Sequence, residues 1–150
     1  MRLACLVVAC LPMLGQSSGV SSVAKAPGET VTLDISAESQ PGKEPIALKW
    51  EVIFPAQLME IEAAGPEIGK AAMDSGKSIK CTLRNPYTYV CVVSDGQKPI
   101  ADGLIASFHF KIRTTAQARI VTLKIEAAES TTADSRKWPL NNTEAFVVIQ

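Results

Sequence analysis

Apolar and polar residues alternate along most of this chain with a period of two, which is the side-chain spacing of a β-strand. The run "TVTLDISA" at residues 30–37 and the run "IALKWEVIF" at 46–54 both place an apolar residue at every second position. The pattern returns in "IASFHFKIR" at 105–113, "IVTLKIEA" at 120–127 and "EAFVVIQ" at 144–150. Each run predicts a strand with one buried face, and "LMEIEAAG" at 58–65 predicts a shorter strand. The one helix that the pattern suggests is short, around residues 68–73.

Turn-forming pairs separate these runs. They are Pro41-Gly42, Gly65-Pro66, Ser75-Gly76, Asp95-Gly96, Asp102-Gly103 and Asn141-Asn142. Because strands and turns alternate every dozen or so residues, the sequence predicts an all-β protein, an antiparallel β-sandwich of about nine strands. The expected core comprises Val31, Leu33, Ile35, Ala37, Ile46, Leu48, Trp50, Val52, Phe54, Ala106, Phe108, Phe110, Ile112, Val121, Leu123, Ile125, Ala127 and Phe146.

The stretch "KCTLRNPYTYVCVV", residues 80–93, predicts a hairpin whose turn is centred at Pro86. This register places Cys81 directly opposite Cys91, close enough for a disulfide after a small local adjustment. Such a bond persists in an oxidising compartment. The alternative is a pair of buried free thiols. A zinc site is disfavoured, because the two cysteines lack CxxC spacing and His109 is the only histidine.

If both cysteines face the core, strict alternation sends the other phase of the hairpin outward. That phase consists of Lys80, Thr82, Arg84, Thr88, Val90 and Val92. Exposed Val90 and Val92 with polar neighbours would form an apolar centre with a polar rim, the usual build of a protein interface. The alternatives are the reversed register, with the valines buried, and a loop that covers them.

The amino terminus has the layout of a signal peptide: Arg2, an apolar run over residues 3–14, then small residues. The run is too short to span a membrane comfortably. We therefore expect a signal peptide at 1–19, with cleavage somewhere in 15–26, a short leader at 20–27, one domain at 28–150, and a secreted protein. Cleavage would remove Cys5 and Cys10 and leave one cysteine pair. The competing interpretation is a lipoprotein anchored through Cys10, since "LVVAC" loosely resembles a lipobox.

Charge and candidate chemistry exclude several classes of function. The formal net charge is zero, with acidic and basic residues interspersed, which gives no electrostatic basis for binding nucleic acid. No serine or cysteine nucleophile has a recognisable base and orienting acid, so an enzyme is not expected. No cofactor or metal site is expected either. Turn chemistry explains Asp95 and Asp102 at least as well as calcium binding does.

Direct binding of a polysaccharide is the main alternative function, and it calls for exposed planar aromatic side chains. Most aromatic residues fall in the expected core. Trp138, beside Pro139, and Tyr87, in the hairpin loop, remain as candidate sugar-stacking residues. A tryptophan folded over the edge of the sandwich is the plain structural interpretation of Trp138.

The order of several segments resembles a cohesin domain over about residues 28–150. These segments are "GETVTLDISAES", "IALKWEVIFPAQLMEIEAAGPEIG", "DGLIASFHFKIR" and "ESTTADSRKWPLNNTEAFVVI". The resemblance implies a jelly-roll β-sandwich related to carbohydrate-binding modules, with no catalytic signature. It also implies that a dockerin-like protein partner binds one sheet face, which includes strands from the 79–93 region. Two features depart from the pattern, because "FPAQL" lacks the usual acidic residue and the cysteine pair is atypical.

These observations together predict a secreted, non-catalytic recognition module that binds a protein partner, within an extracellular assembly related to polysaccharides. Polysaccharide binding and a structural role in an envelope or surface assembly are the alternatives.

Overall fold

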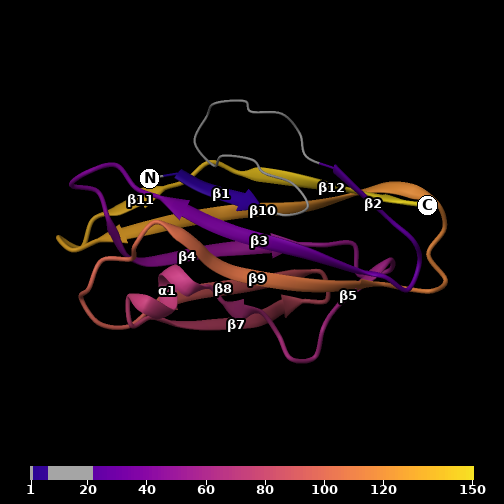
Figure 1. Ribbon diagram of the computed structural model, residues 1–150, viewed down its shortest axis with the longest axis horizontal. Helices are drawn as coiled ribbons and strands as arrows, with labels where there is room; N and C mark the ends of the chain where they lie inside the picture. The colour runs from indigo at the N-terminus through magenta and orange to yellow at the C-terminus, as the bar shows by residue number, and fades with distance from the viewer. Residues whose placement is uncertain (1, 7–21) are drawn as a thin grey trace.

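The alternating runs form two β-sheets that pack face to face, as Figure 1 shows for the computed structural model, which describes residues 2–6 and 22–150. One sheet, here the β9 sheet, has the order β1 (Arg2–Leu6), β3 (Thr30–Glu38), β9 (Gly103–Ile112) and β5 (Met59–Ile61), with β6 (Glu67–Ile68) also on β9. The other, the β10 sheet, has the order β2 (Ser22–Lys25), β12 (Thr143–Ile149), β10 (Arg119–Thr132), β4 (Pro45–Ile53), β8 (Thr88–Ser94) and β7 (Ser78–Asn85), with β11 (Lys137–Pro139) on β10.

The predicted antiparallel β-sandwich is therefore confirmed. Neighbouring strands run antiparallel except β2, which pairs parallel with β12. The part of the chain that the structure describes has twelve strands, more than the nine predicted, because β1, β6 and β11 are short additions at sheet edges. The helix α1 (Lys70–Asp74) lies close to its predicted place, and β5 is the short strand expected in "LMEIEAAG".

The core fills the space between the sheets and is built from the apolar phases of the long strands. Trp50, Phe108 and Phe110 are fully buried, with the Trp50 and Phe108 rings 6.3 Å apart at an edge-to-face angle of 83°. Burying one large apolar side chain stabilises the folded state by about 1.5–3 kcal/mol, so burial of these apolar phases is the main driving force for folding. The alternating burial along β3, with Val31, Leu33, Ile35 and Ala37 inside, follows the sequence prediction.

Three residues of the predicted core are not buried as expected. A bulge in β10 between Glu126 and Glu129 gives Ala127 a left-handed backbone with φ 49° and makes it exposed, while Ala128 takes the core position. An extra residue reverses the side-chain phase after it, which strict alternation cannot foresee. Phe146 is half-buried on the outer phase of β12, and Ile46 is also half-buried.

Helix α1 closes one end of the sandwich through a close contact with β9. Ala71 and Ala72 join the core, and the Gly69 amide donates to the Ile105 carbonyl at 2.7 Å. A Cβ atom at Gly69 would overlap the Leu104 carbonyl, so only glycine fits this approach. Just after the helix, the Lys77 ammonium donates to the Asp95 carbonyl at 2.7 Å; burial lowers the pKa of Lys77, and the Asp95 charge partly counters this.

The N-terminal segment adds strands to both sheets. Strand β1 pairs antiparallel with β3, on the side of β3 opposite β9, and residues 7–21 lie outside the described part of the chain. Most of the predicted signal peptide and the first part of its cleavage window therefore fall where the structure gives no description. Within the predicted leader at 20–27, Ser22–Lys25 forms β2, which lines the edge of β12.

Candidate protein-binding face

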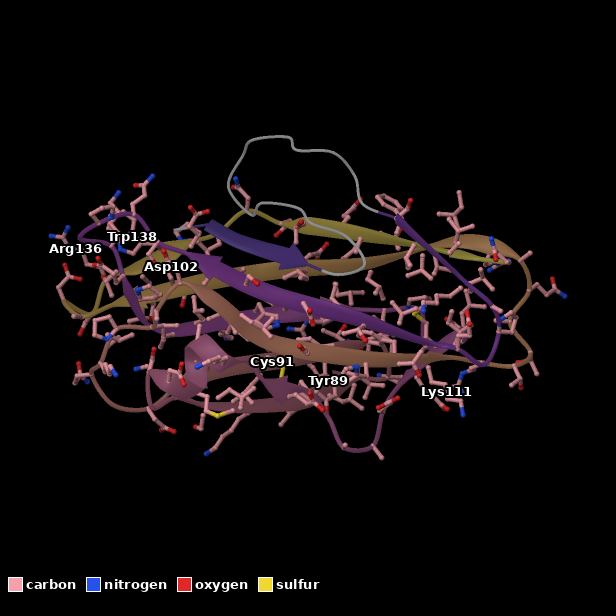
Figure 2. The ribbon with its side chains drawn as sticks, viewed as in Figure 1. Tyr89, Cys91, Asp102, Lys111, Arg136 and Trp138 are labelled. Carbon is pink, nitrogen blue, oxygen red and sulfur yellow. A yellow bond between two sulfur atoms is a disulfide. The ribbon has the colours of Figure 1, made fainter. Side chains whose placement is uncertain are left out.

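The β7–β8 hairpin is stapled by a disulfide in the register that the sequence predicts. Cys81 and Cys91 are directly paired across the two strands and joined by a disulfide, and their Cα atoms are 4.1 Å apart. Figure 2 shows Cys91 in the middle of the molecule. Cys91 and Val93 are fully buried, so Val90 and Val92 project from the opposite side of β8, where both are half-buried.

The outer surface of the β10 sheet collects these valines with the polar phases of three neighbouring strands. Val90 lies between Thr82 of β7 and Glu51 of β4, and Glu51 in turn pairs with Glu126 of β10. The next row across the strands contains Lys80, Val92, Lys49 and Glu129. We call this surface the outer face and define it by Lys80, Thr82, Arg84, Val90, Val92, Lys49, Glu51, Glu126 and Glu129.

An ion pair lies near the centre of the outer face. Both terminal nitrogens of Arg84 bond the two carboxylate oxygens of Glu51, one of them at 3.0 Å. The Glu51 side chain is only 12% exposed, whereas that of Arg84 is 57% exposed. Because a carboxylate this buried needs a partner, Arg84 is held across β8 rather than extended freely into solvent.

Thr88 is a correction to the predicted set of exposed residues. The predicted outward phase of the hairpin included Thr88, but its exposed fraction is 1%. The β7–β8 pairing shifts between Leu83 and Asn85, so that Thr88 pairs with Asn85 on one side and with Ile53 of β4 on the other. The hairpin loop is tied down beside it, because the Phe54 amide donates to the Tyr87 carbonyl at 3.0 Å. Thr88 is thereby enclosed, while Lys80, Thr82 and Arg84 are exposed as predicted.

A hollow extends the outer face towards the hairpin loop. It has a volume of about 470 Å³, and its lining includes Ile53, Tyr87, Lys124 and Glu126. Tyr87 is 52% exposed. This concave, partly aromatic region is continuous with the valine rows through Glu126, so the outer face combines an apolar centre, a charged rim and a hollow.

The outer side of the β9 sheet has a different character. Its side chains bond one another: the Ser107 hydroxyl donates to Asp34 at 2.6 Å, and Thr32 Oγ1 lies 3.1 Å from His109 Nδ1. Arg113 pairs with Glu60 at 3.1 Å. Polar groups that already satisfy one another offer a partner little to bind, so we take the β10 sheet as the candidate binding surface.

The two candidate sugar-stacking residues are not brought together. Tyr87 follows β7 at the Ile53 end of β4, whereas Trp138 of β11 pairs with Ser130 of β10, towards the Pro45 end of β4. Trp138 is 38% exposed and lines a separate pocket at that end of the sandwich (Figure 2). The chain therefore has no single platform containing both aromatic rings.

Residues considered for metal or catalytic roles take part in local structural contacts. Asp102 accepts a hydrogen bond from the Ser39 amide at 2.8 Å, and Asp95 has a φ of 97° and bonds the Ser78 hydroxyl. His109 is half-buried between Thr32 and Glu67, whose carboxylate lies 3.8 Å from Nε2. Within residues 2–6 and 22–150, no group of three or more His, Cys, Asp or Glu side chains is arranged to hold a metal ion. No helix in the same ranges is long and apolar enough to cross a membrane.

Sequence reasoning missed part of the outer face. Lys49 and Glu51 belong to the polar phase of the 46–54 run, and Glu126 and Glu129 belong to the β10 run, but nothing in the sequence places β4 and β10 beside the hairpin. The polar phase alone could have supplied the candidates. Their neighbours depend on strand order, which is a tertiary property.

Comparison with known proteins finds the same architecture in solved cohesin modules. The chain superposes on Coh-OlpA of Clostridium thermocellum, in complex with the dockerin Doc918, with a TM-score of 0.72 and 13% identity over 85% of this chain and 94% of that one. The sixth cohesin of Acetivibrio cellulolyticus scaffoldin B, in complex with a Cel5 dockerin, gives 0.70 and 15% over the same shares. A non-cellulosomal cohesin from Archaeoglobus fulgidus gives 0.62 and 16% over 83% of this chain and 86% of that one.

Neither the family models nor the curated proteins include a match to this sequence. The structural likeness is nevertheless extensive, because it covers most of this chain and nearly all of each cohesin. The chain has a cohesin-like fold, as the resemblance implied.

Proposed function

We propose that this protein is a non-catalytic recognition module that binds a protein partner through the outer face. The single observation that carries the proposal is the pair of half-buried valines, Val90 and Val92, flanked by charged side chains on a sheet held rigid by the disulfide. An apolar centre with a charged rim lets a partner bury hydrophobic area while the rim selects its orientation. The cohesin-like fold supports the proposal, because two of the structural neighbours are complexes with dockerins.

The partner on this proposal is a dockerin-like module or another secreted or envelope protein, in an extracellular assembly related to polysaccharides. Its complementary surface would carry apolar side chains opposite Val90 and Val92. It would also carry charges of both signs, since the rim includes Lys49 and Lys80 as well as Glu126 and Glu129. The leader pattern and the cysteine pair, which survives in oxidising compartments, support a location outside the cytoplasm.

The test uses the chain Val20–Gln150 as bait. Partner proteins are captured from the secreted and envelope fractions of the source organism, once with calcium and once with a chelator. The captured protein is then purified and titrated against variants. Val90→Glu and Val92→Glu should each weaken binding at least tenfold, because each buries an uncompensated carboxylate in the interface. Loss of binding with chelator would identify a calcium-dependent, dockerin-like partner.

Met73→Glu is the matched control, because Met73 is an apolar residue on α1 that is 58% exposed and lies outside the outer face. It should leave affinity unchanged. Unfolding curves of all variants check that the fold is intact, and Thr82→Glu, at an exposed position, provides a second face variant with less structural risk. Undiminished binding by folded Val90→Glu, Val92→Glu and Thr82→Glu would refute the proposal.

A further inference from the structure

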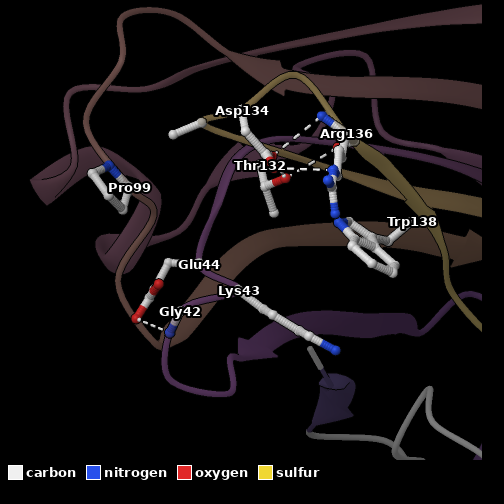
Figure 3. A pocket seen from close by; sticks show the side chains of 9 residues that line it. Gly42, Lys43, Glu44, Pro99, Thr132, Asp134, Arg136 and Trp138 are labelled. Atoms are coloured by element: carbon white, nitrogen blue, oxygen red, sulfur yellow. Dashed lines mark hydrogen bonds and ion pairs between the residues drawn. The ribbon is translucent and has the colours of Figure 1, made fainter.

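A second concave site lies at the end of the sandwich, apart from the outer face (Figure 3). Its volume is about 470 Å³, within the range of small-molecule pockets. The β3–β4 connection supplies Lys43 and Glu44, the turn after β10 supplies Asp134 and Arg136, and β11 supplies Trp138. Segments far apart in the sequence thus converge on one aromatic ring.

Trp138 gives the pocket an apolar surface. The other tryptophan, Trp50, is fully buried in the core, whereas Trp138 is 38% exposed and belongs to a three-residue strand whose members are all exposed. The ammonium of Lys43 lies 5.1 Å from the centre of the Trp138 ring. A large aromatic surface exposed among polar side chains offers a stacking platform.

The acidic side chains of the pocket already have partners. Asp134 accepts hydrogen bonds from the Thr132 hydroxyl at 2.5 Å and the Arg136 amide at 3.4 Å, and it pairs with Arg136 Nε at 3.2 Å. Glu44 accepts a hydrogen bond from the Gly42 amide at 3.2 Å. The Thr132 hydrogen bond is the main cause of a lowered pKa at Asp134, so this carboxylate stays ionised and keeps Arg136 in place.

The basic side chains of the pocket retain nitrogen atoms that could bind a ligand. Among residues 2–6 and 22–150, the Arg136 side chain is paired through Nε alone, which leaves its two terminal nitrogens for a ligand. Among the described residues, no carboxylate lies within 4.0 Å of the Lys43 ammonium, which is placed over the tryptophan ring. The pocket therefore presents the Lys43 ammonium and the terminal nitrogens of Arg136 beside an aromatic surface, while its formal charges balance through Glu44 and Asp134.

The turn that carries Asp134 and Arg136 is rigidly built. The Thr132 amide donates to the Arg136 carbonyl at 3.0 Å, the Ser135 amide donates to the Thr132 carbonyl at 2.9 Å, and Ser135 has a left-handed φ of 64°. A guanidinium held by such a turn loses little freedom when a ligand binds, which favours affinity.

We propose that this pocket binds acidic saccharides, with a pyranose ring stacked on Trp138 and its carboxylate held by Arg136 and Lys43. A sugar ring presents an apolar C–H face to the indole and hydroxyl groups to the surrounding polar side chains. The Lys43 ammonium and the terminal nitrogens of Arg136 select a uronic acid over a neutral sugar, and bidentate contact suits the Arg136 nitrogens. Lys43 leaves the ring face when the sugar stacks there and turns its ammonium to the carboxylate.

The experiment is an NMR titration of the chain from Val20 to Gln150 with hexagalacturonate, followed through the two tryptophan indole N–H signals. The Trp138 signal should move with saturation, whereas the buried Trp50 signal should stay and report an intact core. Trp138→Ala, which lacks the reporting ring and is followed through backbone amide signals, and Arg136→Gln should each weaken binding about tenfold, on the scale of a lost stacking or charge-assisted contact. Lys43→Gln should weaken binding, and added salt should weaken wild-type binding severalfold.

Cellohexaose, sodium acetate at equal carboxylate concentration and the variant Tyr87→Ala are the controls. Equal binding of cellohexaose would overturn the selection for acid, and the same Trp138 shift with acetate would reduce the site to a simple anion contact and overturn the proposal. Absence of a Trp138 shift, or unchanged affinity in Trp138→Ala, would also overturn it. Each result is independent of the proposed protein partner, because Trp138→Ala, Arg136→Gln and Lys43→Gln leave the outer face and its hollow unchanged.

Discussion

At the scale of single residues, the outer face depends on one carboxylate that is almost enclosed. Glu51 lies on the solvent side of β4, yet its side chain is 12% exposed because Arg84 crosses β8 to cover it. The same arginine that the sequence assigns to a binding surface is thus committed to an intramolecular pair. A partner that binds the Arg84 guanidinium would also have to supply a new partner for the Glu51 carboxylate. Arg84 therefore shapes the outer face rather than acting as a free positive charge.

Arg84→Ala is expected to lower the free energy of unfolding by about 1–2 kcal/mol, because it leaves the Glu51 carboxylate buried without a cation. The value is at the low end for an ion pair of this kind, since Arg84 itself is 57% exposed and solvent screens it. Adding Glu51→Gln should recover part of the loss. Urea unfolding of the two single variants and the double variant measures the coupling, and strictly additive effects would show that the pair contributes nothing.

At the scale of elements, the β7–β8 hairpin combines a local staple with an exposed edge. β7 is the last strand of its sheet, and Leu83, on the phase that pairs with Tyr89, is 53% exposed. The hairpin therefore has less packing support than a central strand, and the disulfide compensates by restricting the unfolded chain. Because the sulfurs lie on the inner side, the bond holds Val90 and Val92 in register without occupying the outer face.

The double variant Cys81→Ala/Cys91→Ala is expected to lose about 2.5–3 kcal/mol of stability, the chain-entropy value for a loop of about eleven residues. Adding a reductant to the wild type should produce a similar loss, and the reductant should leave the variant unchanged. Chemical denaturation with and without reductant makes the comparison. Equal stability of the oxidised wild type and the double variant would show that the disulfide forms without adding to the free energy of unfolding.

At the scale of the whole molecule, the sandwich separates two candidate surfaces. The outer face covers the solvent side of β7, β8, β4 and β10, while the Trp138 pocket lies at the end where the β3–β4 connection meets the turn after β10 (Figures 1 and 3). Strand β2 lines the edge of β12 in the same sheet as the outer face, and its Val23 packs against the core. We therefore expect the folded domain to include β2.

A chain that begins at Pro27 should be less stable than one that begins at Val20 by about 1–2 kcal/mol, since it loses the burial of Val23 and the pairing with β12. It should also aggregate more readily, because the β12 edge would be open to other chains. Thermal unfolding and light scattering compare the two chains. Val23→Ala in the longer chain separates the contribution of the Val23 side chain from that of the strand pairing. Equal stability of the two chains would show that β2 does not contribute to the stability of the domain.

Local sequence patterns predict the strand runs, the core phase of β3, the short helix and the pairing of Cys81 with Cys91, because each follows from the alternation of neighbouring residues or from one turn. Sequence-based prediction failed at Ala127, which the β10 bulge exposes by changing the side-chain phase, and at Thr88, which keeps the phase of Val90 but is buried beside the hairpin loop. Strand order brought Glu51 to Val90, and loop packing brought Lys43 to Trp138. These contacts depend on the packing of the whole chain, because they join residues whose separation along the sequence carries no periodic signal.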